Sequence, residues 1–237
     1  MRKFNRKNDQ IRDISIETNI NKNSDGSCLI RLGDTHVICT ASFENDVPQW
    51  LKNSDSGWIT AEYGMLPGST STRNRREAAK GKQSGRTVEI QRLIGRSLRT
   101  VVDLKKIKGS QIILDCDVIQ ADGGTRTASI SGAFIALSLA IKRLLNKKIL
   151  RENPIKDYLA AISCGILNEE IYVDLDYTED SQASVDANFI FSQTLGIAEV
   201  QVSGERSTFK YEDLKQMIKM SEISVRKIFE IQKKVLN

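Results

Sequence analysis

The segment from Gln111 to Leu144 constrains the fold more than any other part of this 237-residue chain. Residues 111–120 are rich in β-branched side chains and predict a strand. From Ala128, apolar residues recur at helical spacing and predict a helix. Two adjacent glycines lie between the two patterns, in Asp122-Gly-Gly-Thr-Arg-Thr127. A strand that turns into a long helix is typical of a mixed α/β domain.

The rest of the chain continues this mixture of strands and helices. Residues 27–43 predict a hairpin, in which Gly33-Asp34 separates two apolar runs. The periodicity predicts further strands at 159–167, 171–177 and 187–192, and further helices from Val88 and Glu212. No linker or short repeat is visible. We therefore expect one α/β (α+β) domain over residues 1–237.

Composition excludes several classes of protein. Apolar residues make up 40% and charged residues 27%, as in ordinary soluble globular proteins. The four cysteines lie in apolar runs without metal-ligand spacing, and His36 is the one histidine, so a zinc site is not expected. The N-terminus shows no signal region, and the longest apolar run, 133–141, is too short to span a membrane. We expect a cytoplasmic protein with reduced thiols and no membrane partner.

Two loops place glycine, arginine and threonine at the start of a predicted helix. One contains Gly124-Thr-Arg126 and the other is Gly85-Arg-Thr87. Helix N-termini present unpaired N–H groups and a partial positive charge, so each loop can bind an anion. Arginine adds forked hydrogen bonds to phosphate. With a net charge of +5 favouring an anionic partner, we interpret four residues as one phosphate site: Arg86, Gly124, Thr125 and Arg126.

These loops have two other interpretations. A glycine-rich loop alone is also typical of a simple strand-to-helix turn. The run from Gly81 to Thr87 resembles a P-loop, but its glycine spacing is one residue short and Arg86 stands where Lys is required. We therefore do not expect an NTPase.

Residues 70–82 form a basic segment with five cations and one anion, immediately before the Arg86 loop. Such a charge run is typical of a solvated surface loop, and it also suits a path for a phosphate backbone. No aromatic residue lies in the segment, so base stacking is not indicated there. The candidate nucleic-acid-binding residues are Arg73, Arg75 and Arg76.

Five carboxylates lie within thirteen residues and form an acidic segment, from Asp174 to Asp186. Asp174 and Asp176 alternate with apolar residues of a predicted strand, so we expect them on one strand face, serving the fold or solubility. Glu179 either orients Asp180 or faces solvent. The turn-forming residues 178–184 include Asp180, and they allow the chain to fold back and bring Asp180 next to Asp186.

Two neighbouring carboxylates have three ordinary roles. They bind Mg²⁺ or Mn²⁺, act as general acid and base, or only solubilise a turn. Together with a phosphate site, Asp180 and Asp186 are consistent with metal-assisted phosphoryl transfer. Because His36 lies in a predicted hairpin strand, we do not expect imidazole catalysis.

Several long motifs occur in the order found in one enzyme family. They are Gly33–Val37, Gly57–Pro67, Arg76–Lys82, Gly85–Ile94, Leu114–Ser129 and Asp174–Ser181. Through them the chain resembles the bacterial ribonuclease PH family along nearly its whole length. Gly68 and Ser71 depart from the Arg and His common in the family, and Gln201–Glu205 departs from its usual Gln-Gly-Thr-Ala-Glu.

The resemblance implies a phosphate-dependent 3′–5′ exoribonuclease, or tRNA nucleotidyltransferase. Its substrates would be tRNA precursors and other structured RNA 3′ ends, with inorganic phosphate as co-substrate and nucleoside diphosphates as products. It also implies a mixed-sheet domain with βαβ units, shared with polynucleotide phosphorylase and exosome ring subunits, a homo-hexamer arranged as a trimer of dimers, and Mg²⁺ or Mn²⁺. Arg86 and Gly124-Thr125-Arg126 match the family's phosphate site, and Asp180 and Asp186 match its catalytic and metal-binding acids.

The expected reaction is in-line attack of phosphate on the 3′-terminal phosphodiester. Asp180 and Asp186 either hold a metal beside the phosphorus, or one of them protonates the leaving 3′-oxygen. Two rival functions remain. A catalytically silent ring subunit would lack some of the paired acids and arginines, whereas a hydrolytic nuclease would need more clustered acids and no phosphate cradle.

Overall fold

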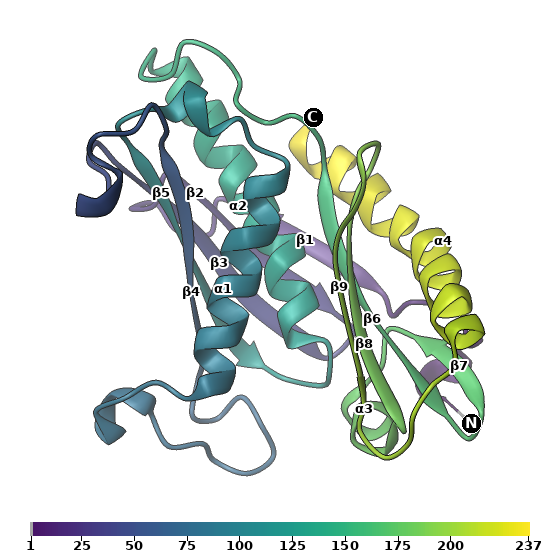
Figure 1. Ribbon diagram of the computed structural model, residues 1–237. Helices are drawn as coiled ribbons and strands as arrows, with labels where there is room; N and C mark the ends of the chain where they lie inside the picture. The colour runs from purple at the N-terminus through teal and green to yellow at the C-terminus, as the bar shows by residue number, and fades with distance from the viewer. Residues whose placement is uncertain (1) are drawn as a thin grey trace.

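The computed structural model describes residues 2–237 and arranges their nine strands in two sheets (Figure 1). The first sheet is mixed, with the order β1-β2-β3-β5-β4. Its strands are β1 (Ile14–Thr18), β2 (Gly26–Leu32), β3 (Thr35–Glu44), β4 (Trp58–Met65) and β5 (Gln111–Gln120). The second sheet is antiparallel, with the order β7-β6-β8-β9. Its strands are β6 (Leu159–Leu167), β7 (Glu170–Val173), β8 (Val185–Ser192) and β9 (Gly196–Gly204).

Three long helices cover the sheets (Figure 1). α1 (Gly85–Thr100) and α2 (Thr125–Asn146) pack on the first sheet, and α2 also contacts β6 of the second. α4 (Tyr211–Leu236) packs against β6 and β7. The short helical segments are η1 (Lys3–Asn5), η2 (Gln49–Leu51), η3 (Glu77–Lys80), η4 (Leu104–Ile107) and α3 (Tyr177–Gln182).

The first sheet contains the predicted hairpin and a βαβ unit. β2 and β3 pair antiparallel across the Gly33 turn, where a φ of 54° favours glycine. β4 and β5 are parallel neighbours joined through α1. α1 follows Ser84, whose hydroxyl accepts a hydrogen bond from the Thr87 N–H at 3.2 Å. This mixture confirms the predicted α/β (α+β) class, with strands divided between two sheets rather than one.

Helix α2 lies at the centre of the molecule, between strands of both sheets. By length and composition α2 could cross a membrane. The uninterrupted apolar run at 133–141, on which the sequence expectation depended, is shorter than the apolar part of this helix. However, 72% of its apolar window is buried inside the fold, as in the core helix of a globular protein. Phe134 of α2 is 1% exposed and belongs to the main core. A second core, which includes Phe189, lies between α4 and the second sheet. The single-domain organisation stays a prediction.

Local patterns predict most elements but misplace the acidic segment. The strands predicted at 111–120 and 159–167 have the bounds of β5 and β6. The strand predicted at 171–177 is wrong after Val173, because β7 ends there and Asp174 adopts a φ of 54°. Most of the turn expected at residues 178–184 belongs to α3, which begins with a capping box formed by Asp176 and Glu179. The sequence patterns did not predict β1, β4 and β9.

Candidate active site

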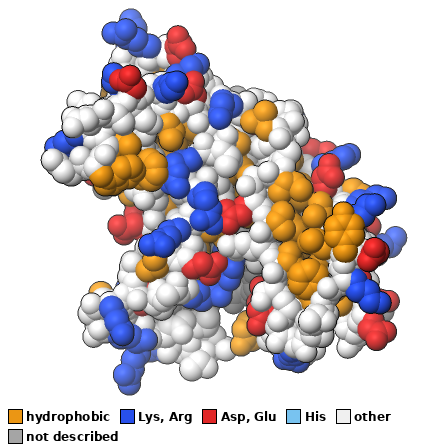
Figure 2. Space-filling model, viewed as in Figure 1, with side chains coloured by type: hydrophobic (Ala, Val, Ile, Leu, Met, Phe, Trp, Pro, Cys, Tyr) orange, Lys and Arg blue, Asp and Glu red, His pale blue; other side chains and the backbone are white. Residues whose placement is uncertain are grey.

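The first turns of α1 and α2 lie at the same end of the molecule, beside α3 (Figure 1). Arg86 is the second residue of α1, and Arg126 is the second residue of α2. Both helices therefore direct unpaired N–H groups and their positive ends to one region. Figure 2 shows the surface hollowed here, with Lys, Arg, Asp and Glu side chains gathered around the hollow.

Two glycines shape the loop that leads into α2. Gly123 and Gly124 have φ values of 73° and 64°, in the left-handed region that favours glycine. A Cβ atom on Gly123 would lie 2.5 Å from the carbonyl oxygen of Leu175, so a side chain does not fit. Gly124 is the N-cap residue and has no side chain to bond the first N–H groups of the helix. These groups can therefore bind water or an anion.

Thr125 and Tyr63 form the floor of this loop. The Tyr63 hydroxyl donates a hydrogen bond to Thr125 Oγ1 at 3.0 Å, and both residues are buried. Burial raises the pKa of Tyr63, although the bond to Thr125 and the charges of Arg86 and Arg126 oppose the shift. The phenol therefore stays protonated and acts as a hydrogen-bond donor. The charges of Arg86 and Arg126 both act on this hydroxyl group.

Side chains from α1 and β9 hold Arg126 in place. Its Nη1 lies 3.4 Å from Glu89 Oε1 and donates to Gln201 Oε1 at 3.3 Å. Gln201 Nε2 donates to Glu89 Oε1 at 3.3 Å, which closes the triangle. Sequence patterns gave no sign of this arrangement, because its three members come from distant parts of the chain.

The two candidate acids face these arginines. Asp180 lies in α3, and Asp186 is the second residue of β8. Burial, and then repulsion from Asp180, raises the pKa of Asp186 to about 6. Burial also raises the pKa of Asp180, although the residue keeps part of its surface exposed to solvent. Arg86 and Arg126 lower both values, so all four side chains lie within reach of one another's charge.

Glu205 is a third carboxylate near this pair that sequence reasoning did not assign to the site. It follows β9, and its N–H donates to the Ser184 carbonyl at 3.0 Å. Its charge acts to raise the pKa of both Asp180 and Asp186. The sequence did contain a signal for Glu205, because this residue is the last of the segment Gln201–Glu205, which partly matches a family motif.

The other acids of the acidic segment are structural. Asp174 is 1% exposed and accepts a hydrogen bond from Arg12 Nη2 at 2.7 Å. Glu179 is buried and pairs with Arg2 at 2.6 Å, so of its two predicted roles the one in which it faces solvent is wrong. Its carboxylate also accepts the Asp176 N–H at 3.1 Å. These acids therefore hold the turn that leads to the candidate pair.

Three arginines are exposed in the loop between β4 and η3: Arg73, Arg75 and Arg76. The next residue, Glu77, accepts a hydrogen bond from the Thr87 hydroxyl at 2.8 Å. This contact fastens the loop that carries the three arginines, called the basic loop below, to the first turn of α1, which carries Arg86. This contact places the basic loop beside the proposed phosphate site.

Within residues 2–237, no group of three or more His, Cys, Asp or Glu side chains is arranged to hold a metal ion. Asp180 and Asp186 together offer two carboxylates. Mg²⁺ in proteins is commonly bound through one or two carboxylates, with water and substrate phosphates completing its shell. The donor set is therefore compatible with an ion shared with substrate, rather than one enclosed by protein ligands.

Comparisons with known proteins identify the family. Two models match, the 3′ exoribonuclease family domain 1 at residues 10–142 and domain 2 at residues 157–224. A protein named ribonuclease PH from Cereibacter sphaeroides is 52% identical over 236 residues, covering 100% of both chains. The chain belongs to the ribonuclease PH family. This membership confirms the predicted phosphorolytic 3′–5′ exoribonuclease of tRNA processing, with RNA and phosphate as substrates.

Solved structures show the ribonuclease PH fold in more distant proteins. Rice (Oryza sativa) Rrp46 has a TM-score of 0.80 and 19% identity, covering 98% of this chain and 99% of its own. A chain of the Archaeoglobus fulgidus exosome with RNA bound to the active site has a TM-score of 0.82 and 21% identity, covering 95% and 90%. At these identities the likeness supports the fold alone.

Proposed function

We propose that the phosphate co-substrate binds to Arg86, Gly124, Thr125 and Arg126, and that Asp180 and Asp186 act on the scissile phosphodiester. The supporting observation is that both arginines lower the pKa of both aspartates. Side chains from α1, α2, α3 and β8 thus carry opposite charges within reach of one another. Neither a silent RNA-binding subunit nor a simple charged turn requires this combination.

The reaction begins when an oxygen of inorganic phosphate attacks the phosphorus of the 3′-terminal phosphodiester. The bond to the 3′-oxygen of the preceding nucleotide breaks, so the RNA keeps a 3′-hydroxyl and the last nucleotide leaves as a nucleoside diphosphate. Arg86 and Arg126 hold the attacking phosphate by forked hydrogen bonds and offset its charge. Asp186, with a pKa of about 6, is partly protonated near neutral pH and supplies the proton to the leaving oxygen.

Asp180 and Asp186 would also hold Mg²⁺ or Mn²⁺, together with oxygens of the substrates. A bound divalent ion would offset the repulsion between phosphate and RNA. Because a carboxylate must be ionised to bind an ion, ion binding and proton donation compete at Asp186. Calorimetric titration of Mg²⁺ should therefore show weaker binding below about pH 6. Binding that is independent of pH would remove Asp186 from the metal site.

A tRNA with a short 3′ tail tests the proposed reaction directly. We expect nucleoside diphosphates with phosphate present, and loss of product in its absence or in Asp180→Asn. Nucleoside monophosphates formed without phosphate would instead indicate a hydrolytic nuclease. RNA binding without any product would indicate a silent subunit. Asp13→Asn, which changes an exposed aspartate, is the matched control.

We further propose that tRNA precursors and other structured RNA 3′ ends lie along the basic loop. Arg73, Arg75 and Arg76 are exposed, and Glu77 ties their loop to the start of α1. An RNA backbone bound there would lead toward the proposed phosphate site.

The proposed assembly is a homo-hexamer, a trimer of dimers, in the cytoplasm. β9 is an edge strand of the second sheet, and its Ile197 and Val200 are 49% and 41% exposed. Figure 2 shows a hydrophobic patch over β8 and β9, beside α4. Apolar patches of this kind mark contacts with other chains. Sedimentation of the active enzyme as a monomer would contradict the assembly.

A further inference from the structure

Arg12 is a buried cation that contacts both loops of the proposed site. It precedes β1 and is 1% exposed. Its Nη2 donates to Asp174 Oδ1 at 2.7 Å, and its Nε donates to Asp174 Oδ2 at 3.1 Å. The Arg12 backbone N–H donates to the same carboxylate at 2.6 Å. The ion pair is therefore bidentate and shielded from solvent.

The remaining guanidinium donors reach backbone carbonyls of two different segments. Nη1 donates to the carbonyl of Asp122, and Nη2 lies 3.4 Å from the carbonyl oxygen of Gly123. Nη2 also donates to the Leu175 carbonyl at 3.3 Å. One planar side chain thus joins the phosphate loop (residues 122–124) to the acid turn (residues 174–176). The phosphate loop starts α2, and the acid turn starts α3, which carries the proposed acid four residues later.

Thr35 holds the phosphate loop from a second direction. Its hydroxyl donates to the Gly123 carbonyl at 2.6 Å and accepts the Asp122 N–H at 2.9 Å. A Cβ atom on Gly123 would approach Leu175 O within 2.5 Å, so the phosphate loop and the acid turn are in direct contact. The contacts of Thr35, Leu175 and the guanidinium together leave this loop little freedom to shift.

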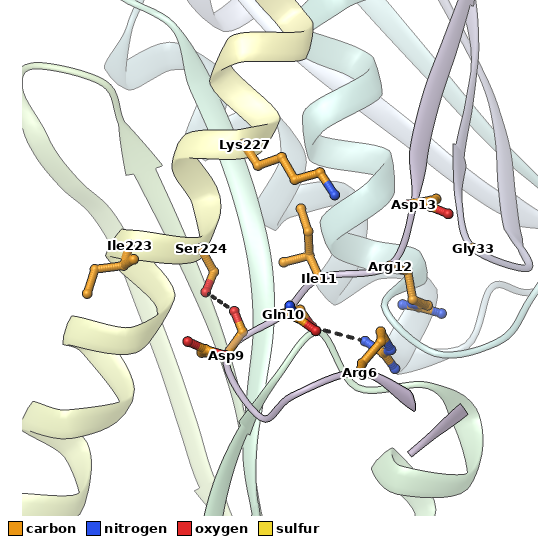
Figure 3. A pocket seen from close by; sticks show the side chains of 10 residues that line it. All are labelled: Arg6, Asp9, Gln10, Ile11, Arg12, Asp13, Gly33, Ile223, Ser224 and Lys227. Atoms are coloured by element: carbon orange, nitrogen blue, oxygen red, sulfur yellow. Dashed lines mark hydrogen bonds between the residues drawn. The ribbon is translucent and has the colours of Figure 1, made fainter. Parts of the chain in front are cut away.

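A cavity of about 530 Å³ lies beside the Arg12–Asp174 ion pair. Figure 3 shows Arg6 and Arg12 close together at one end of it, while Ser224 and Lys227 come from α4. A shorter cation at position 12 would therefore have adjoining space in which water can solvate it. This makes Arg12→Lys a suitable probe, because it keeps the charge beside Asp174 but lacks the planar fork.

We propose that Arg12 is a positioning residue that sets the distance between bound phosphate and Asp180. The inference rests on the proposed roles of the phosphate loop and of Asp180. Arg12 acts through the two loops, and its charge also lowers the pKa of Asp180, an effect that Arg12→Lys would keep. Without its three carbonyl contacts, the start of α2 can move relative to α3, and a displacement of about 1 Å can cost about 10²-fold in rate.

The test is phosphorolysis by the full-length Arg12→Lys enzyme, with phosphate varied at saturating RNA. We expect kcat divided by the phosphate KM to fall roughly tenfold or more, with the fold retained by circular dichroism. Arg31→Lys is the matched control, because the Arg31 guanidinium forms an exposed ion pair with Glu17, at an N–O distance of 2.6 Å, instead of bonding to either loop. A purely structural role would lower the melting temperature and leave kcat and the phosphate KM unchanged, and that result would overturn the proposal.

Coupling to Arg126 gives a second readout. If Arg12 acts through the phosphate loop, the effects of Arg12→Lys and Arg126→Ala should be strongly non-additive, whereas additive effects would contradict the proposal. Should Arg12→Lys fail to fold, Thr35→Val loosens the same loop without a buried charge, and a normal phosphate KM there would also reject it. An unchanged phosphate KM in Arg126→Ala alone would instead reject the phosphate site itself.

Discussion

Replacing Asp186 with Asn should stabilise the folded protein at neutral pH while removing most of its turnover. Asp186 is partly buried on β8, and burial followed by repulsion from Asp180 raises its pKa from 3.8 to about 6. Asn keeps the shape of the side chain and removes the charge that burial opposes. The loss of a group acting on the leaving oxygen should lower turnover by about 10²-fold.

The size of the stabilisation follows from the pKa. A rise from 3.8 to about 6 corresponds to roughly 3 kcal/mol, at about 1.36 kcal/mol for each pKa unit. Solvent screens part of this at a partly exposed side chain, so we expect roughly 1–3 kcal/mol. The folded state binds the proton more tightly than the unfolded state. The free-energy cost of carrying an ionised Asp186 in the folded state is therefore absent below about pH 4. It grows up to about pH 6 and is complete above that pH.

The assay is thermal and urea unfolding of the parent and Asp186→Asn proteins between pH 4.5 and pH 8. At about 2–4 °C per kcal/mol for a chain of this size, the variant should melt several degrees higher at pH 8. The advantage should shrink as the pH falls toward about 4. The electrostatic reasoning would be refuted if the variant were less stable than the parent at pH 8, or if its stability advantage were the same at every pH. Asp13→Asn, at an exposed site, should change stability by less than about 0.5 kcal/mol.

Three further changes test other parts of the molecule. Arg126→Ala should raise the phosphate KM roughly tenfold or more, since a charge-assisted hydrogen bond contributes about 1.5–3 kcal/mol; steady-state kinetics with an unchanged KM would contradict this. Changing Arg73, Arg75 and Arg76 to Gln should lower the salt dependence of tRNA binding by ~0.7–0.9 in log–log slope for each lost phosphate contact. Retention of the parental slope would mean that the basic loop is only solvated. Asp174→Asn should lower the free energy of unfolding by roughly 3–5 kcal/mol in urea titrations, because it leaves a buried arginine unpaired; near-parental stability would show that the ion pair is dispensable.

The strand–loop–helix unit around Gly123 could be predicted because its signals are local. β-branched residues, two glycines and a helical apolar period all lie within 111–144, and β5 and α2 occupy the expected places. Arg86 and Arg126 could be proposed as a pair because the same residue types recur at two helix starts, and their pairing in one phosphate site stays a prediction. The contacts that hold Arg126 could not be predicted, because Glu89 and Gln201 reach it from α1 and β9.

The acidic segment shows why spacing alone was insufficient. Alternation from Val173 to Tyr177 is consistent with a strand, yet Asp174 leaves the β region to meet Arg12. Its partner lies 162 positions earlier, beyond the reach of any local pattern. The same applies to Glu179, because its ion pair with the distant Arg2 excludes the alternative that it faces solvent.

The 162-residue separation between Arg12 and Asp174 also bears on the order in which the chain can fold. Arg12 lies in the segment matched by the first family model, and Asp174 in the segment matched by the second. A nascent chain that ends before Asp174 would have to bury this guanidinium without its counterion or keep it in water. Contacts between such distant residues form late and slow folding. During synthesis, the start of α2 should therefore reach its final place only after β7 has been made.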